Sequence, residues 1–203
     1  PGGRVLCLTM GPPQARALLE DALSRGADEA VLLTDDKFAG ADTPATACAL
    51  ALAVRRIATE IFKSGDYILV AGMQSVDGDT AQVPPQVAED LGIEHIAYVS
   101  GFEAAEDGTL RVTRIGPQGL ETVAPLKTPF LATLVNCMPA ANRGFSRARE
   151  ARTEPGRVLT WNAQAVGAAP ERVGLKGSRT WVVRIFSSSN QRAQPCVYPK
   201  TVD

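Results

Sequence analysis

The polar stretch GMQSVDGDTAQVPP, residues 72–85, follows a short apolar run and carries the residue types best suited to binding chemistry. Asp79 and Gln82 are three residues apart, a spacing typical of a capping box, so we expect Asp79 to cap a helix that runs to about residue 91. The backbone N–H groups from about Thr80 onward would then meet an anion, assisted by the helix dipole. The same residues also fit a tight, capped turn that binds no ligand.

Gly78 and the aspartates beside it limit what this loop could hold. Glycine tolerates a positive φ and lets the backbone approach a ligand closely, so we expect both properties at Gly78. A carboxylate that faced a diphosphate would be repelled by it. Asp77 and Asp79 are therefore expected to face the backbone, ribose hydroxyls or solvent.

A second polar stretch, FAGADTPAT at residues 38–46, also lies between an apolar run and a helical pattern. Pro44 suits the first position of a helix, and Asp42 or Thr43 suits its cap. Met10 ends a third apolar run. Because loops at the carboxyl ends of parallel strands lie at one edge of a sheet, the three stretches predict a nucleotide-sized cleft. The G-x-G-x-x-G fingerprint and the Walker pattern are both absent.

The elements that would position these loops are visible as alternating apolar patterns. Short continuous apolar runs at residues 4–9, 29–33 and 67–71 predict strands. Helical spacing predicts helices at residues 14–25 and 44–63. This alternation indicates an α/β fold, doubly wound and Rossmann-like, with a mostly parallel sheet that is covered by helices on both faces.

The second half of the chain changes character. Its strand-like segments look antiparallel and extend or flank the same sheet, at residues 96–102, 110–115, 120–123 and 130–135. Residues 187–203 are too polar to form a core, so we expect one domain over residues 1–186 and an extended C-terminal arm laid across a partner. The sequence starts with a strand pattern and without Met, so the natural first strand is expected to be missing.

Composition disfavours several classes of function. The formal net charge of the 203 residues is −1, which gives no electrostatic reason for a nucleic-acid partner. No apolar run approaches the roughly 20 residues that cross a bilayer, and no signal-peptide layout opens the chain, so we expect no membrane insertion and a cytoplasmic location. Four separated cysteines and a single histidine, His95, predict neither a metal site nor a catalytic triad. His95 itself is expected in a surface turn before a strand.

Four segments make the sequence recognisable: LTMGPP followed by ALSRGADEAVLL, then FAGADT, then GMQSVDGDTAQVPPQVAEDLGI, and finally VGLKGSRTWVVRIF. From residue 4 to about residue 186 the chain resembles the beta subunit of an electron transfer flavoprotein, the family that includes the nitrogen-fixation FixA proteins. The DGDTAQV-x-P motif is the most specific part of this resemblance. The family's first strand and the loop after it are what this chain lacks.

The resemblance implies a nucleotide or flavin at the predicted loops. In one branch of the family the beta subunit holds only AMP, whereas in the other it holds a second FAD, which takes hydride from NADH and divides the electron pair. The DGDTAQV and FAGADT motifs resemble the second, electron-bifurcating branch, so FAD is expected and AMP is the alternative. Carried over to this chain, the binding residues are Met10 at the adenosine, Asp42, Thr43 and Thr46 at the flavin ring, and Ser75, Asp77, Gly78, Asp79, Thr80, Ala81, Gln82 and Val83 around the diphosphate and ribose.

The resemblance also implies protein partners. The family pairs with an alpha subunit that carries the shuttling FAD, and it exchanges electrons with an acyl-CoA dehydrogenase-type partner and, when bifurcating, with ferredoxin or flavodoxin. The basic segment at residues 136–149 resembles the family's recognition loop, with arginines where lysines are usual. Its candidate contact residues are Asn136, Met138, Phe145, Arg147 and Arg149.

Two other interpretations stay open from the sequence. The basic segment also fits a solvated surface loop, since charged loops are usually exposed. The whole chain also fits a stand-alone adenine-nucleotide-binding or stress-type domain without a redox role.

Overall fold

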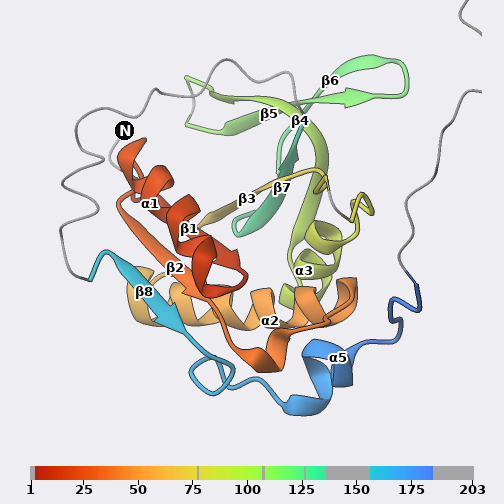
Figure 1. Ribbon diagram of the computed structural model, residues 1–203. Helices are drawn as coiled ribbons and strands as arrows, with labels where there is room; N and C mark the ends of the chain where they lie inside the picture. Colours follow the sequence, from red (N-terminus) through yellow and green to blue (C-terminus); the bar gives the residue numbers. More distant parts are fainter. Residues whose placement is uncertain (1–2, 77, 107, 126, 136–155, 185–203) are drawn as a thin grey trace, which may run out of the picture.

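The structure, a computed structural model, describes residues 3–76, 78–106, 108–125, 127–135 and 156–184. Strands and helices alternate over the first half of the chain (Figure 1). The strands are β1 (Leu6–Met10), β2 (Glu29–Leu33), β3 (Ile68–Gly72), β4 (Glu94–Ala104), β5 (Leu110–Gly116), β6 (Gly119–Val123), β7 (Phe130–Leu134) and β8 (Val158–Trp161). The α-helices are α1 (Arg16–Ser24), α2 (Thr43–Arg56), α3 (Val83–Leu91) and the short α5 (Gly174–Gly177).

The strands form two sheets. The first has three strands in the order β1-β2-β8, and both of its pairs are parallel. The second has five strands in the order β3-β7-β4-β5-β6; its pairs are parallel from β3 to β4 and antiparallel from β4 to β6. The predicted α/β fold with a mostly parallel sheet and antiparallel additions is therefore confirmed.

Three details of the expected sheet are wrong. β7 is parallel to both of its neighbours, because it fills the position between β3 and β4, which run in the same direction. β3 pairs with β7 and not with β1 or β2, so the first three strands are divided between the two sheets. β8 and α5 lie in a part of the chain for which the apolar pattern predicted no element.

β2 shows why helices cover both faces of the first sheet. Its side chains alternate between two layers, as they must in a strand. Ala30 and Leu32 belong to the same buried cluster as Leu19 and Leu23 of α1. The alternate residues of the strand, Val31 and Leu33, pack in another cluster with α2. The doubly wound arrangement therefore follows from a strand whose four residues after Glu29 are all apolar and buried.

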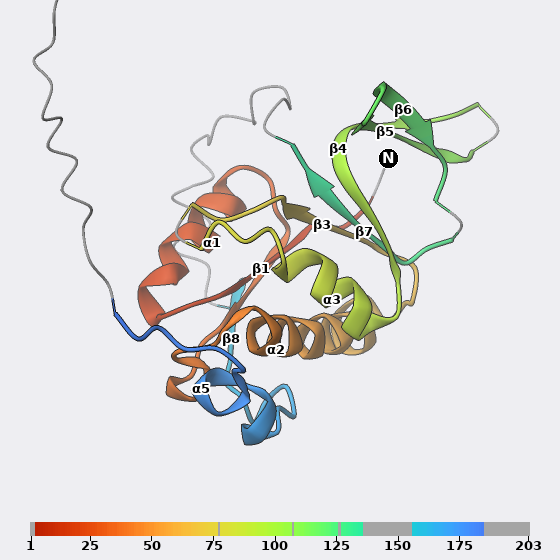
Figure 2. The ribbon, with the colours of Figure 1, turned by 90° about the vertical axis from the view of Figure 1, so that its right-hand side faces the viewer.

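α2 joins the two sheets through a row of small side chains. Ala49 and Ala53 pack against the first sheet, and Ala47 and Ala51 pack in the cluster that contains α3 and Leu131 of β7. Figure 2 shows α2 and α3 side by side, in keeping with their shared cluster. Alanine leaves little volume between helix and strand backbones, so the helix start is held rigidly by both layers.

His95 lies inside β4 and not in the expected surface turn. It pairs in register with Leu131, and its Nε2 lies 3.3 Å from Thr133 Oγ1. The side chain is half-buried, and this burial lowers the pKa of the imidazole, because desolvation disfavours the charged form. Within the described residues, no helix combines the length and the apolar character needed to cross a membrane.

Candidate functional site

Asp42 caps the start of α2. Its backbone is extended, and its Oδ1 accepts a hydrogen bond from the N–H of Ala45 at 3.1 Å. The sequence left the cap to Asp42 or Thr43, and the structure assigns it to Asp42. Pro44 occupies the first turn, where its missing N–H leaves no donor unpaired.

The second oxygen of the same carboxylate holds the C-terminal part of the described chain. Asp42 Oδ2 accepts hydrogen bonds from the N–H of Arg179 at 2.7 Å, from the N–H of Thr180 at 3.0 Å and from Thr180 Oγ1 at 3.2 Å. Burial by itself raises the pKa of Asp42, but these donors and the N–H of Ala45 outweigh it and lower the pKa below its ordinary value. The carboxylate is therefore ionised at neutral pH, and both of its oxygens accept hydrogen bonds from the protein.

Asp79 does not cap α3, contrary to the capping-box prediction. α3 begins at Val83, its N-cap is Gln82, and no side chain caps it. Pro84 and Pro85 lie in its first turn and lack N–H groups, so the helix start has few donors for a cap to satisfy. Asp79 Oδ1 instead accepts a hydrogen bond from Gln74 Nε2 at 2.5 Å, which closes the loop on itself.

Positive φ angles occur in this loop, but not at Gly78. Asp79 has a φ of 51° and Ala81 a φ of 55°. A Cβ placed on Gly78 would meet only Ser75 Oγ, at 3.4 Å, which is an ordinary contact. The expectation of a positive φ at Gly78 is therefore wrong, and the unusual backbone lies one and three residues later. The N–H of Asp79 donates to the carbonyl of Ser75 at 3.0 Å, which forms the turn.

A side-chain hydrogen bond brings the two predicted loops together. Thr43 Oγ1 donates to Gln82 Oε1 at 3.2 Å, so the starts of α2 and α3 lie next to each other. Within the described residues, the backbone N–H groups of Thr80, Ala81 and Val83 have no hydrogen-bond partner. Ala81 has a positive φ and Gln82 is right-handed helical, an alternation that in other proteins points neighbouring N–H groups toward one spot.

For the other predicted binding residues that it describes, the structure gives the position and the burial. Met10 ends β1 and packs partly against the buried cluster of the first sheet. Thr46 lies three residues after Thr43 in α2 and therefore on the same side of the helix. Ser75 and Gly78 are exposed. Asp77 lies outside the described residues, as do Asn136, Met138, Phe145, Arg147 and Arg149.

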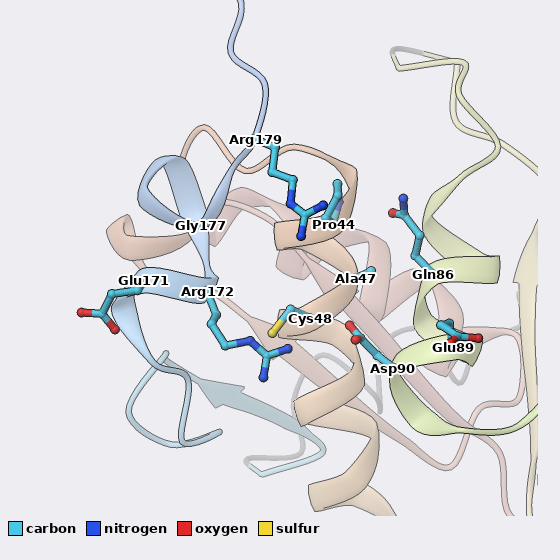
Figure 3. Close-up of a pocket in the computed structure, with 10 residues that line it drawn as sticks. All are labelled: Pro44, Ala47, Cys48, Gln86, Glu89, Asp90, Glu171, Arg172, Gly177 and Arg179. Carbon is cyan, nitrogen blue, oxygen red and sulfur yellow. The ribbon is translucent and has the colours of Figure 1, made fainter.

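A pocket of about 540 Å³ lies beside this site, between α2, α3 and residues 171–179 (Figure 3). Figure 3 shows the guanidinium of Arg179 near Pro44, whereas that of Arg172 lies toward Cys48. Burial raises the pKa of the Cys48 thiol, so it stays protonated and is a poor nucleophile. None of the predicted binding residues lines this pocket. Its lining consists of Pro44, Ala47, Cys48, Gln86, Glu89, Asp90, Glu171, Arg172, Gly177 and Arg179.

Residues 174–180 are a part of the site that the element pattern missed. Leu175 N–H donates to the Ala39 carbonyl at 3.0 Å, and Asp42 N–H donates to Ser178 Oγ at 2.8 Å. The loop that carries FAGADT is thus joined along its length to the segment that carries VGLKGSRT. Both motifs were visible in the sequence, but nothing in a linear pattern shows that two segments 136 residues apart are in contact.

Comparisons with known proteins point to one family. Residues 1–165 match the electron transfer flavoprotein domain. The FixA protein of Bradyrhizobium diazoefficiens is 39% identical over 189 residues, which cover 92% of this chain and 64% of FixA. The electron transfer flavoprotein beta subunit of Clostridium acetobutylicum is 40% identical over 201 residues, which cover 99% of this chain and 73% of that protein.

A third relative comes from a named complex. Subunit CarD of the caffeyl-CoA reductase–Etf complex of Acetobacterium woodii is 38% identical over 188 residues, which cover 92% of this chain and 68% of CarD. The chain thus spans about two thirds of the length of such relatives. The domain match and the identities over nearly the whole chain place it in the family of electron transfer flavoprotein beta subunits and FixA proteins.

Proposed function

We propose that the chain is the beta subunit of a heterodimeric electron transfer flavoprotein and binds FAD where the starts of α2 and α3 meet. The observation that carries this proposal is a group of N–H donors at Thr80, Ala81 and Val83 that have no hydrogen-bond partner among the described residues, next to the hydrogen bond between Thr43 and Gln82. Such donors suit the diphosphate of a dinucleotide, because an anion can satisfy several of them at once.

The residues of the chain bind and orient the cofactor in this proposal. The turn from Ser75 to Val83 wraps the diphosphate and ribose, and Met10 contacts the adenosine. Thr43 and Thr46, on one side of α2, present hydroxyl groups to the flavin ring. When bound, FAD supplies the electron chemistry by taking hydride from NADH, so the protein needs no general acid or base for that step.

The experiment that tests this function is a count of the nucleotides released when the purified heterodimer is denatured. We expect two FAD per heterodimer, one from each subunit, and reduction of the complex by NADH. One FAD and one AMP would instead identify the AMP-binding type, which transfers electrons without bifurcation. Absence of both nucleotides from this chain would refute a nucleotide site at the loop and leave a stand-alone domain as the better interpretation.

The alpha subunit is proposed to cover residues 181–183, which directly follow the two residues that Asp42 binds, Arg179 and Thr180. Trp181, Val182 and Val183 are consecutive, have no regular secondary structure, and are 71%, 76% and 86% exposed. Contiguous exposed apolar side chains are a feature of protein–protein interaction sites. Residues 1–186 then form the domain, and residues 187–203 continue as an arm on the same partner.

Tryptophan fluorescence provides a test of this contact. Trp181 is exposed, whereas Trp161 is only 8% exposed. We expect the emission maximum to shift to shorter wavelength when the alpha subunit binds, because Trp181 leaves water while Trp161 changes little. Trp181→Phe should abolish the shift and Trp161→Phe should keep it. A shift that survives Trp181→Phe would place the interface elsewhere.

The basic segment at residues 136–149 is proposed to dock an acyl-CoA dehydrogenase-type partner, with ferredoxin or flavodoxin as the low-potential acceptor of a bifurcating complex. Asn136, Met138, Phe145, Arg147 and Arg149 are the proposed contacts. Charge complementarity at such a segment mainly raises the rate of encounter.

A further inference from the structure

Asp42 was predicted to lie at the flavin ring, but its carboxylate is occupied by the protein itself. Oδ1 accepts from the N–H of Ala45, and Oδ2 accepts from two N–H groups and one hydroxyl of Arg179 and Thr180. A carboxylate oxygen that accepts three hydrogen bonds has little capacity left for a ligand. The two oxygens serve two separate purposes: one caps α2 and the other holds the C-terminal segment.

The carboxylate is the last anchor before the exposed strip of residues 181–183. Ser178 Oγ also bridges the segment, since it accepts from Asp42 N–H at 2.8 Å and lies 2.8 Å from the Gly174 carbonyl. Beyond Thr180, the described residues 181–184 have no backbone hydrogen bond to the rest of the described chain. The direction in which the strip leaves the domain is therefore set at Arg179 and Thr180.

We propose that Asp42 is a positioning residue that fixes residues 178–184 against the start of α2 and so presents the strip Trp181–Val183 to the alpha subunit. This inference rests on the proposed function, which supplies the partner. The same side chain, Asp42, therefore both caps α2 and orients the strip that binds the partner. Fixing the strip before association lowers the entropy cost of ordering it in the complex.

Asp42→Asn separates the two purposes, because asparagine has one acceptor oxygen in place of two. Asparagine is among the preferred N-cap residues, so we expect its oxygen to keep the bond from Ala45 and its NH₂ group to face Arg179 and Thr180, where it cannot accept. In hydrogen exchange of the full chain, the amides of Arg179 and Thr180 should exchange about fivefold faster, while the amide of Ala45 keeps its protection. Affinity for the alpha subunit should fall by about fivefold.

Asp35→Asn is the matched control. Asp35 also uses both oxygens, accepting from Lys37 N–H at 3.0 Å and from Ala163 N–H at 3.0 Å, but it does not contact residues 178–184. We expect a comparable loss of stability and no change in affinity for the alpha subunit. Thr180→Val, which removes only the hydroxyl contact, should give a smaller effect on exchange in the same direction as Asp42→Asn.

Several outcomes would overturn this inference. Unchanged exchange at Arg179 and Thr180 in Asp42→Asn would show that the carboxylate does not fix the segment. Faster exchange with unchanged affinity for the alpha subunit would refute the positioning role in docking, as would an equal affinity loss in Asp35→Asn. If the wild-type chain bound no alpha subunit, the proposed function would fail, and the inference would fall with it.

Discussion

Gly174→Ala is expected to lower the free energy of unfolding by about 3 kcal/mol, the largest loss of stability that we predict. Gly174 has a φ of 59°, a left-handed conformation that costs an alanine about 1–2 kcal/mol. A Cβ at this position would also overlap the backbone carbonyl of Lys37, which cannot rotate away as a side chain would. Relief requires the segment to move, at a further cost of about 1–3 kcal/mol.

Gly167→Ala is the control for the conformational part of this effect. Gly167 has a φ of 66°, and a Cβ there would meet no heavy atom within 4 Å. We expect a loss of only about 1 kcal/mol, measured for both variants by urea unfolding. Equal losses for the two variants would contradict the tight contact between the VGLKGSRT segment and the loop after β2.

Ala81→Pro is expected to weaken FAD binding by about thirtyfold. Proline cannot adopt the φ of 55° found at Ala81, and it removes an N–H donor that has no partner in the described part of the chain. A hydrogen bond to a charged acceptor contributes about 2 kcal/mol, which corresponds to about thirtyfold in affinity. Calorimetric titration with FAD, and separately with AMP, measures the change.

Two control variants test whether the loss of FAD affinity comes from the backbone of residue 81 or from any change of side chain in the loop. Ala81→Gly keeps both the left-handed conformation and the N–H, so it should bind FAD as the wild type does. Gly78→Ala should also bind normally, because Gly78 has no positive φ and a Cβ there makes an ordinary contact. Unchanged affinity in Ala81→Pro would mean that the loop is a turn without a ligand.

The sequence predicted the local features of this fold well. Every strand from β1 to β7 was expected within a few residues of its place, because continuous or alternating apolar runs report burial directly. The N-cap of α2 was narrowed to Asp42 or Thr43, since cap chemistry depends on neighbouring residues. Predictions of this kind use information that lies within one segment.

Features that depend on distant segments were not predictable in the same way. The apolar pattern of β3 does not specify β7 as its partner, and β8 is too short for its pattern to stand out. Asp79 and Gln82 have the spacing of a capping box, but two prolines in the first turn and the bond to Gln74 favour another arrangement. The second oxygen of Asp42 is the clearest case, because its partners follow 137 and 138 residues later.

The bond between Asp42 and Thr180 also has a consequence for the order in which the chain is built. During synthesis, α2 and its cap to Ala45 can form as soon as the residues of α2 are available, since those contacts are local. The contacts of Arg179 and Thr180 close a loop that encloses the whole of the second sheet, so they wait until these two residues have left the ribosome. A chain that is interrupted before residue 178 would contain the predicted cofactor loops and yet lack the segment that Asp42 holds.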